Sequence, residues 1–335
     1  MKITDFDFVL PEDLIAERPL RERSRSRLFV FHGNAKAEHR TFSDLPSYLT
    51  KGDMLIINNT KVFPARLTGV KKNGGKVEIL LVGKKNDQEW EVLSKGGFTG
   101  PLRVSEELQL DLLKGSSAQF RYSGDFMDLL WRYGNMPIPP YIKRQPDHSD
   151  KETYQTIFAK EEGSIAAPTA GLHFTDVLLR DIAAQGVKVR EVTLHVGVGT
   201  FKPVRAENVD EHSMDEEYFE LDQALLSEIR EVKAAGKKIV TVGTTATRAL
   251  EGYASGRCTV VSANGKVRGN TNIFIYPGYA FKVIDALITN FHLPRSTPLM
   301  LVSALIGREN LLAAYREAIA AGYRFLSYGD AMLIL

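Results

Sequence analysis

The sequence predicts an α/β fold, built on a mixed sheet with flanking helices, into which a small all-β barrel domain is inserted. From about residue 155 onward, helical and strand patterns alternate, which is typical of an α/β sheet. Between residues 53 and 121 the pattern changes to short, alternating, β-branched runs separated by glycine-rich turns, which is typical of a barrel or sandwich. A chain of 335 residues also exceeds the usual size of a single core, which favours two domains.

The first predicted elements are two strands and a short helix. RLFVFHGNAKAEHRTF, residues 27–42, indicates two strands joined by a Gly-Asn turn, and SDLPSYLTKG, residues 43–52, indicates a short helix. The barrel strands follow, and this section closes with a helical turn in FMDLLWRYG and a proline-rich exit in PIPPY. We therefore predict a discontinuous α/β domain of residues 1–57 and 155–335 and an inserted β-barrel domain of residues 58–154.

The second half of the chain is predicted to supply most of the sheet and its helices. One helix is preceded by Thr175, carries Asp176 in its first turn and ends at Gly186, which are the residue types expected at helix termini. A strand is also expected around Cys258. The other predicted elements are strands at 187–196, 237–243, 272–278, 286–291 and 331–335 and helices at 221–236, 244–254, 296–307 and 310–322.

The composition is that of an ordinary soluble globular protein, with 44% hydrophobic and 25% charged residues. The N-terminus lacks the apolar region of a signal peptide, and the longest apolar stretch, PLMLVSALIG, has about half of the ~20 residues that cross a bilayer. One cysteine allows neither an internal disulfide nor a thiolate cluster, which fits a reducing compartment. We therefore expect a cytoplasmic protein and, since no long heptad pattern is present, a monomer.

The net charge of +2 is too small to attract a polyanion through a global field, so such a partner would have to bind to local patches. One patch exists in RPLRERSRSR, which places five arginines within ten residues: Arg18, Arg21, Arg23, Arg25 and Arg27. This run is compatible with a solvated surface loop and with a phosphate-binding surface.

Several unusual loops follow the predicted strands. In open α/β sheets, ligands bind beyond the carboxyl ends of the strands, so these loops are candidate site segments. One of them begins a helix, where free amides and the helix dipole suit a phosphate or a carboxylate. The residues concerned are His195, Gly197 and Gly199 in one loop, Gly243, Thr244 and Thr245 at the helix start, His292 in a third loop, and His212, Asp215 and Glu216 in a fourth.

GSIAAPTAGLHFT, residues 163–175, is a further candidate because its residues are too small to fill a core. Small residues let the backbone approach a ligand closely, and His173 offers a group that polarises a bond or transfers a proton. A tight structural crossover would use the same glycines and proline. Both interpretations are open from the residues alone.

Each of the other loops also has an ordinary explanation. Gly197 and Gly199 lack the third glycine of a dinucleotide fingerprint, and threonines commonly cap helices. A single histidine beside a strand is usually a hydrogen-bonded structural residue, and the acidic loop matches no familiar metal spacing. The set argues for function, because four of the seven histidines lie in Gly/Thr/Pro-rich loops of one predicted domain.

Taken together, these stretches resemble the S-adenosylmethionine:tRNA ribosyltransferase-isomerase family of queuosine biosynthesis, also called QueA. The resemblance runs through nearly the whole chain, and its motifs occur in order: LPEDLIAERP, NNTKVFPARL, MPIPPYIKR, YQTIF, AAPTAGLHFT, TLHVGVGTFKPV, VGTTATRALE, IFIYPGYAFKVIDALITNFHLPRSTPLMLVSA and YRFLSYGDAM. Two departures are visible. Asp215 stands where the family has the second histidine of His-x-Met-His, and Pro298 stands where an aliphatic residue is common.

The resemblance implies a reaction in which S-adenosylmethionine is a substrate. Its ribosyl carbons pass to the aminomethyl group of 7-aminomethyl-7-deazaguanine at the tRNA wobble position, adenine and methionine leave, and epoxyqueuosine remains. It also implies an α/β domain with an inserted β-barrel, the tRNA anticodon arm as partner, and no metal or redox cofactor.

This chemistry needs a base next to the sulfonium, hydrogen bonds to the departing adenine, and contacts to the methionyl carboxylate, the wobble base and the phosphates. For catalysis we expect His173 or His195, with His212, His292 and Glu216 as substitutes. For S-adenosylmethionine we expect Thr169, Gly171, Gly197, Gly199, Thr200, Gly243, Thr244, Thr245 and His292. For tRNA we expect Arg21, Arg23, Arg25, Lys143 and Arg144, with base stacking on Phe174, Phe201, Tyr276, Tyr279 or Phe291.

Two other functions are compatible with parts of the sequence. A tRNA methyltransferase that uses S-adenosylmethionine would show a glycine-rich loop after its first strand, and GKKIVTVGTTATRAL lacks that spacing. A non-catalytic tRNA-binding module would leave the histidine-bearing loops unexplained.

Overall fold

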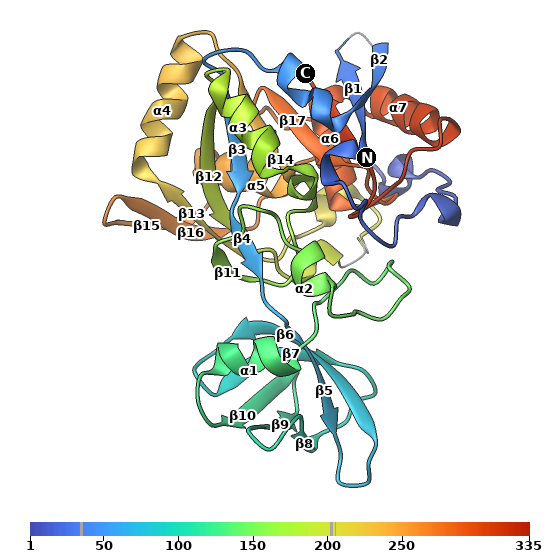
Figure 1. Cartoon of the computed structure of the whole chain (residues 1–335), viewed down its shortest axis with the longest axis vertical. Coiled ribbons are helices and arrows are strands. Elements are labelled where there is room, and N and C mark those ends of the chain that lie inside the picture. Colours follow the sequence, from blue (N-terminus) through green and yellow to red (C-terminus); the bar gives the residue numbers. More distant parts are fainter. Residues whose placement is uncertain (34–35, 202–203, 205) are drawn as a thin grey trace.

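The computed structural model describes residues 1–33, 36–201, 204 and 206–335, without the side chains of Lys36, Thr200 and Phe201. It contains an α/β body that holds both chain termini and a separate β-barrel at the other end of the molecule (Figure 1). The predicted fold class is confirmed: a mixed sheet with flanking helices and an inserted all-β barrel.

The α/β body is built on a ten-stranded sheet. The central strands β12, β3, β14 and β17 are parallel to one another, whereas the strands toward both edges pair mainly in antiparallel fashion. The spatial order is β15 (Thr259–Ala263), β16 (Lys266–Thr271), β13 (Glu217–Asp222), β12 (Lys188–Leu194), β3 (Met54–Asn58), β14 (Ile239–Val242), β17 (Ala286–Asn290), β18 (Ala331–Ile334), β1 (Arg27–His32) and β2 (Lys36–Thr41).

Both faces of this sheet are covered, as the buried central strand β3 shows. Met54 and Ile56 face one core and Leu55 and Ile57 face the other, because successive side chains of a strand point to opposite faces. The first core packs against α4 (Gln223–Ala234), α5 (Gly243–Ser255), α6 (Thr297–Ile306) and α7 (Arg308–Ala320), and the second packs against α3 (Asp176–Ala184) and the 3₁₀ helix Phe42–Tyr48. Thr175 caps α3 through its hydroxyl, as its position predicts.

The barrel consists of six antiparallel strands that close on themselves. Its interior is filled by aliphatic and aromatic side chains, and α1 (Phe126–Tyr133) covers one end. Around the barrel the strands are β10 (Ser117–Tyr122), β7 (Glu89–Ser94), β6 (Lys76–Lys84), β5 (Arg66–Val70), β8 (Gly100–Arg103) and β9 (Leu108–Leu113).

A short junction joins the two bodies. It contains a two-stranded parallel ribbon of β4 (Thr60–Val62) and β11 (Glu161–Ser164), together with α2 (Asp150–Thr153). A small core that includes Val62, Met136 and Tyr154 lies beside this ribbon. The domain boundaries at 58 and 154 stay a prediction of the sequence.

The strand predicted at 272–278 is wrong, because residues 272–276 form an irregular segment. Its backbone groups are engaged by side chains instead of a neighbouring strand: the Ile273 N–H donates to Thr271 Oγ1, and the Ile273 carbonyl accepts from Arg248 Nε. The short helix predicted near residues 43–52 is the 3₁₀ helix Phe42–Tyr48. In the described part of the chain, every helix is too short or too polar to cross a membrane.

Candidate active site

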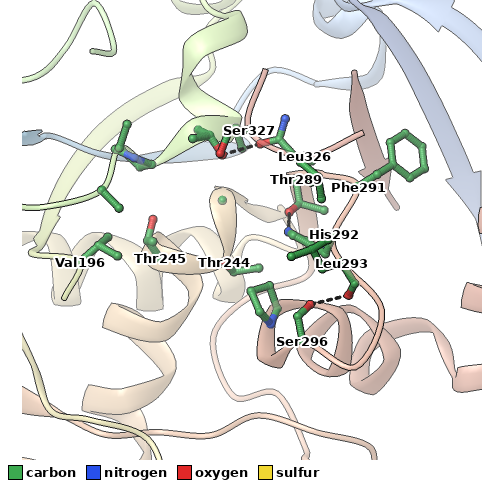
Figure 2. Close-up of a pocket in the computed structure, with 18 of the residues that line it drawn as sticks. Val196, Thr244, Thr245, Thr289, Phe291, His292, Leu293, Ser296, Leu326 and Ser327 are labelled. Atoms are coloured by element: carbon green, nitrogen blue, oxygen red, sulfur yellow. Dashed lines mark hydrogen bonds between the residues drawn. The ribbon is translucent and has the colours of Figure 1, made fainter. Parts of the chain in front are cut away.

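A pocket of about 740 Å³ lies at the carboxyl ends of β12, β14 and β17 (Figure 2). Because these strands are parallel to β3 or to one another, the loops that follow them meet at one edge of the sheet. Val196 follows β12, Gly243 follows β14, and Phe291 and His292 follow β17. The pocket therefore lies where the sequence-based argument expects a ligand.

The N-terminus of α5 forms one wall of the pocket. Gly243 begins the helix with a φ of +87°, a backbone conformation that favours glycine, and the preceding Val242 supplies no side-chain cap. The first amides of the helix are therefore available to a ligand, and the helix dipole favours an anion there. Thr244 and Thr245 line the pocket, and Thr245 Oγ1 is buried without a hydrogen-bond partner.

The small-residue stretch forms a second wall. Residues 166–170 line the pocket with alanines, a proline and the hydroxyl of Thr169. The glycines on either side of them have packing roles, since a Cβ on Gly171 would meet Phe158 at 2.6 Å and one on Gly163 would meet the His195 ring at 2.6 Å. The expected contact of Gly171 with the substrate is therefore not found in the pocket lining: its lack of a side chain admits Phe158.

His173 lies behind the pocket wall, not in it. Its Nδ1 is 2.8 Å from Ser26 Oγ, and its Nε2 is 3.1 Å from Asn290 Nδ2. Asn290 Oδ1 accepts from Thr169 Oγ1 at 2.9 Å, so the Asn290 amide group faces His173 and the proton of His173 is on Nδ1. Burial, aided by the charges of Arg324 and Arg23, lowers the pKa of His173 to about 3. The ring is thus neutral and positions Asn290 and Thr169, which do line the pocket.

His292 is the histidine of the described residues that lines the pocket. Its Nε2 is 3.2 Å from Thr289 Oγ1, its Nδ1 is buried without a partner, and its backbone N–H donates to the Tyr315 hydroxyl at 3.0 Å. Burial lowers the pKa of His292 to about 3, so this imidazole is neutral at physiological pH. A neutral imidazole with an unengaged ring nitrogen is able to accept a proton.

The loop after β12 turns away from the pocket beyond Val196. His195 Nδ1 is 2.8 Å from Thr60 Oγ1, its ring stacks on Tyr218, and burial lowers its pKa. The Gly197 N–H donates to Glu217 Oε1 at 3.1 Å, and a Cβ on Gly199 would lie 2.9 Å from Asp215 Oδ2. His195, Gly197 and Gly199 are therefore absent from the pocket lining. The side chain of Thr200 lies outside the described part of the chain.

The acidic loop contributes a different residue from the predicted ones. His212 packs edge-on against Phe274, and burial lowers its pKa, whereas Glu216 is exposed. The next residue, Glu217, is 3% exposed and pairs with Arg248 of α5. Alternation along the strand identifies Glu217 as inward-facing, because Glu217 begins β13 on the same face as the buried Phe219 and Leu221.

The predicted phosphate-binding residues divide into exposed and engaged ones. Arg21 is exposed, and Arg25 and Lys143 are exposed partners of Glu22 and Glu12. Arg23, by contrast, donates to the backbone carbonyls of Gln155 and Glu152. Arg144 donates two hydrogen bonds to the buried Asp150 and is 13% exposed. Arg23 and Arg144 therefore hold the junction together, and their binding to tRNA phosphates stays a prediction.

Two of the predicted stacking residues are part of the core. Phe174 and Phe291 are fully buried, and Figure 2 shows the Phe291 ring turned away from Thr244 and Thr245. Tyr276 and Tyr279 are half-buried, and the Tyr279 hydroxyl donates to Glu251. Phe201 lies outside the described side chains.

Comparisons with known proteins agree on one family. The family model described as "Queuosine biosynthesis protein" matches residues 3–334. A protein of Thermodesulfovibrio yellowstonii named S-adenosylmethionine:tRNA ribosyltransferase-isomerase is 54% identical, and one of Desulfitobacterium hafniense with the same name is 48% identical; each alignment covers 100% of both chains. The crystal structure of S-adenosylmethionine tRNA ribosyltransferase from Thermotoga maritima is 34% identical, with a TM-score of 0.57 over 99% of this chain and 100% of that one.

Proposed function

Because this chain belongs to the queuosine biosynthesis protein family and is an S-adenosylmethionine:tRNA ribosyltransferase-isomerase, we propose that the pocket beyond β12, β14 and β17 is its S-adenosylmethionine site. The enzyme transfers and isomerises the ribosyl moiety of S-adenosylmethionine onto 7-aminomethyl-7-deazaguanine at the tRNA wobble position, with release of adenine and methionine. One observation supports the site: the pocket unites an uncapped helix N-terminus, a wall of small residues and a neutral histidine.

The helix N-terminus suits the methionyl end of the substrate. S-adenosylmethionine carries its negative charge on the methionyl carboxylate, and the first amides of α5 with the hydroxyls of Thr244 and Thr245 are the donors closest to such a group in the pocket wall. The small residues 166–170 leave room for the flat adenine and the ribose beside them.

We assign to His292 the removal of the substrate proton next to the sulfonium. This imidazole lines the pocket, is neutral at physiological pH, and has one ring nitrogen without a hydrogen-bond partner among the described residues. The lowered pKa that keeps it neutral also makes it a weaker base than a free imidazole. His173 has both ring nitrogens engaged, and His195 lies outside the pocket lining. His173 therefore positions Asn290 and Thr169, and His292 replaces His173 and His195 as the candidate base.

The partner in this proposal is the tRNA anticodon arm, contacted through the exposed Arg21, Arg25 and Lys143. Lys and Arg side chains at the surface bind phosphates without reading sequence. The proposal further includes a monomer that acts in the cytoplasm and a reaction without a metal or a redox cofactor, since S-adenosylmethionine carries the reacting atoms itself.

The test of the proposed function mixes the purified protein with S-adenosylmethionine and tRNA that bears 7-aminomethyl-7-deazaguanine, with guanine-bearing tRNA as control. We expect adenine and methionine to appear together, with a heavier wobble nucleoside on the modified tRNA alone. Release of S-adenosylhomocysteine would indicate methyl transfer instead. Binding of tRNA without any turnover would contradict an enzymatic role.

A further inference from the structure

A second, smaller chamber of about 350 Å³ adjoins the pocket under the first turns of α5. The two cavities share Thr244, Thr245 and Pro298 as lining residues. The rest of the chamber wall is largely apolar, with Met214, Phe274 and Leu301 among its residues. Of the described residues, Arg248 is the charged one that lines it.

Arg248 is 7% exposed and only partly satisfied. Its Nε donates to the Ile273 carbonyl at 3.2 Å, and its Nη1 pairs with Glu217. Its Nη2 is buried and has no hydrogen-bond partner among the residues that the structure describes. A buried donor without a partner is expensive, at roughly 1–3 kcal/mol, so such an atom in a cavity wall calls for a partner from outside the chain.

A second unsatisfied group lies on the same side of α5. Thr245 precedes Arg248 by three residues, a spacing that puts both side chains on one face of the helix, and Thr245 Oγ1 is likewise buried without a partner. Both residues line the chamber, and the uncapped amides of the helix start lie next to Thr245. The donors in this wall thus belong to a guanidinium, a hydroxyl and a helix N-terminus, which together favour an anion.

We propose that this chamber binds the α-carboxylate of the methionyl group of S-adenosylmethionine, held by Arg248 Nη2, Thr245 Oγ1 and the first amides of α5. The inference rests on the proposed function, because it assigns one end of that substrate. The carboxylate is the one anionic group of S-adenosylmethionine; the adenine and ribose are neutral, and the sulfonium and ammonium are cationic.

Glu217 makes this arrangement selective. It fixes the guanidinium through Nη1 and also accepts the Gly197 N–H at 3.1 Å. The guanidinium is therefore held at Nε and Nη1, while Nη2 is left without a hydrogen bond to the described residues. A terminal carboxylate is smaller than a tRNA phosphate, which carries sugars on both sides.

The test compares S-adenosylmethionine with its decarboxylated analogue, S-adenosyl-3-methylthiopropylamine, as substrates for adenine release at saturating modified tRNA. In the wild-type enzyme we expect kcat/KM to be roughly 10- to 150-fold lower without the carboxylate, the range of a hydrogen bond to a charged group. In Arg248→Lys the ammonium keeps a charge for Glu217 but lacks the second nitrogen. In that variant, the ratio of kcat/KM for S-adenosylmethionine to kcat/KM for the analogue should fall most of the way to one. We expect this mainly from a higher KM for S-adenosylmethionine, while the KM for the analogue changes little.

Arg190→Lys is the matched control, because Arg190 contacts Glu228 Oε2 through both Nε and Nη2 in the same α/β body and lines neither cavity. It should keep the wild-type ratio. Should Arg248→Lys fail to fold, Thr245→Val and the double variant Arg248→Gln with Glu217→Gln give the same readout. Full discrimination in these variants, or none in the wild type, would overturn the proposal. Absence of adenine release from S-adenosylmethionine by the wild type would overturn the proposed function instead.

Discussion

The barrel and the pocket edge of the sheet treat buried polar atoms differently. In the described barrel, the buried side-chain atoms without a hydrogen-bond partner are on Arg66 and Trp90. Among the described residues outside the barrel, such atoms on Tyr154, Thr245, Arg248 and His292 line the two neighbouring cavities, whereas those on Thr156, Ser303 and Arg324 line neither. A closed barrel has its strand edges paired and its core filled, so few of its polar groups are left without a hydrogen-bond partner. Unsatisfied polar atoms that gather in one place therefore indicate where a substrate binds.

The largest effect is expected from His292→Ala, which removes the neutral imidazole from the pocket. If His292 takes the substrate proton, kcat falls by about 10²- to 10⁴-fold while tRNA binding persists. The rate of adenine release under single-turnover conditions measures this. His148→Ala, an exposed histidine of the loop before α2, is the control and keeps its rate. Equal rates in the two variants would remove His292 from the chemistry.

The barrel counterpart is Phe120→Ala, which opens a cavity in a side chain that is fully buried in the barrel core. We expect a loss of about 3–5 kcal/mol in the free energy of unfolding of the barrel. Both tryptophans, Trp90 and Trp131, lie in or beside the barrel, so their fluorescence in urea reports on this body. Binding of S-adenosylmethionine should survive at urea concentrations that unfold the variant barrel. Simultaneous loss of both signals would mean that the two regions are one cooperative unit.

The pH dependence of the free energy of unfolding tests the α/β body, because His173 and His292 both lie in it. Folding lowers the pKa of His173 and of His292 from 6.5 to about 3, so between these values the unfolded chain binds more protons. Stability therefore rises with pH across this window, by about 1.4 kcal/mol per pH unit for each histidine, and is lost as pH falls. His173→Gln should reduce the slope of unfolding free energy against pH, between pH 4 and pH 6, by about 1.4 kcal/mol per pH unit. An unchanged slope in urea titrations would contradict a neutral His173.

The smallest effect is expected from exposed arginines. Arg21→Ala removes an exposed charge from the arginine-rich segment, so tRNA affinity falls slightly and the salt slope of binding decreases by about 1. Arg121→Ala removes an exposed barrel arginine that pairs with Asp111, and the salt slope should not change. Filter binding at several salt concentrations measures both. The reverse pattern would assign the tRNA contact to the barrel.

Much of the fold could be predicted from local patterns, because caps and alternation are local. Thr175 at the start of α3 and the alternation along β3 are read directly from neighbours in the sequence. The segment at 272–276 has the composition of a strand but no strand partner, because Thr271 and Arg248 satisfy Ile273. Whether a backbone group forms a hydrogen bond with a side chain distant in sequence depends on the tertiary structure.

The site was predictable as a set of loops but not as a set of roles. His173, His195 and His292 occur in loops of similar composition, and their neighbours in sequence do not distinguish them. Asn290 and Ser26 engage His173 from segments far along the chain, whereas His292 keeps one nitrogen unengaged. The role of Arg248 on α5 could not be predicted from its sequence neighbours, because its partner Glu217 lies on β13, although the alternation along β13 marks Glu217 as inward-facing.

The position of β18 has a consequence for how the protein is made on the ribosome. β18 lies between β17 and β1, with Ala331 beside Leu28 and Asn290, so β1 gains its parallel partner only after residues 331–334 have been synthesised. The barrel strands are close together in sequence and can fold soon after they emerge. Leu326 and Ser327, which line the pocket, are translated just before β18. The lining of the pocket is therefore completed well after the barrel strands have emerged.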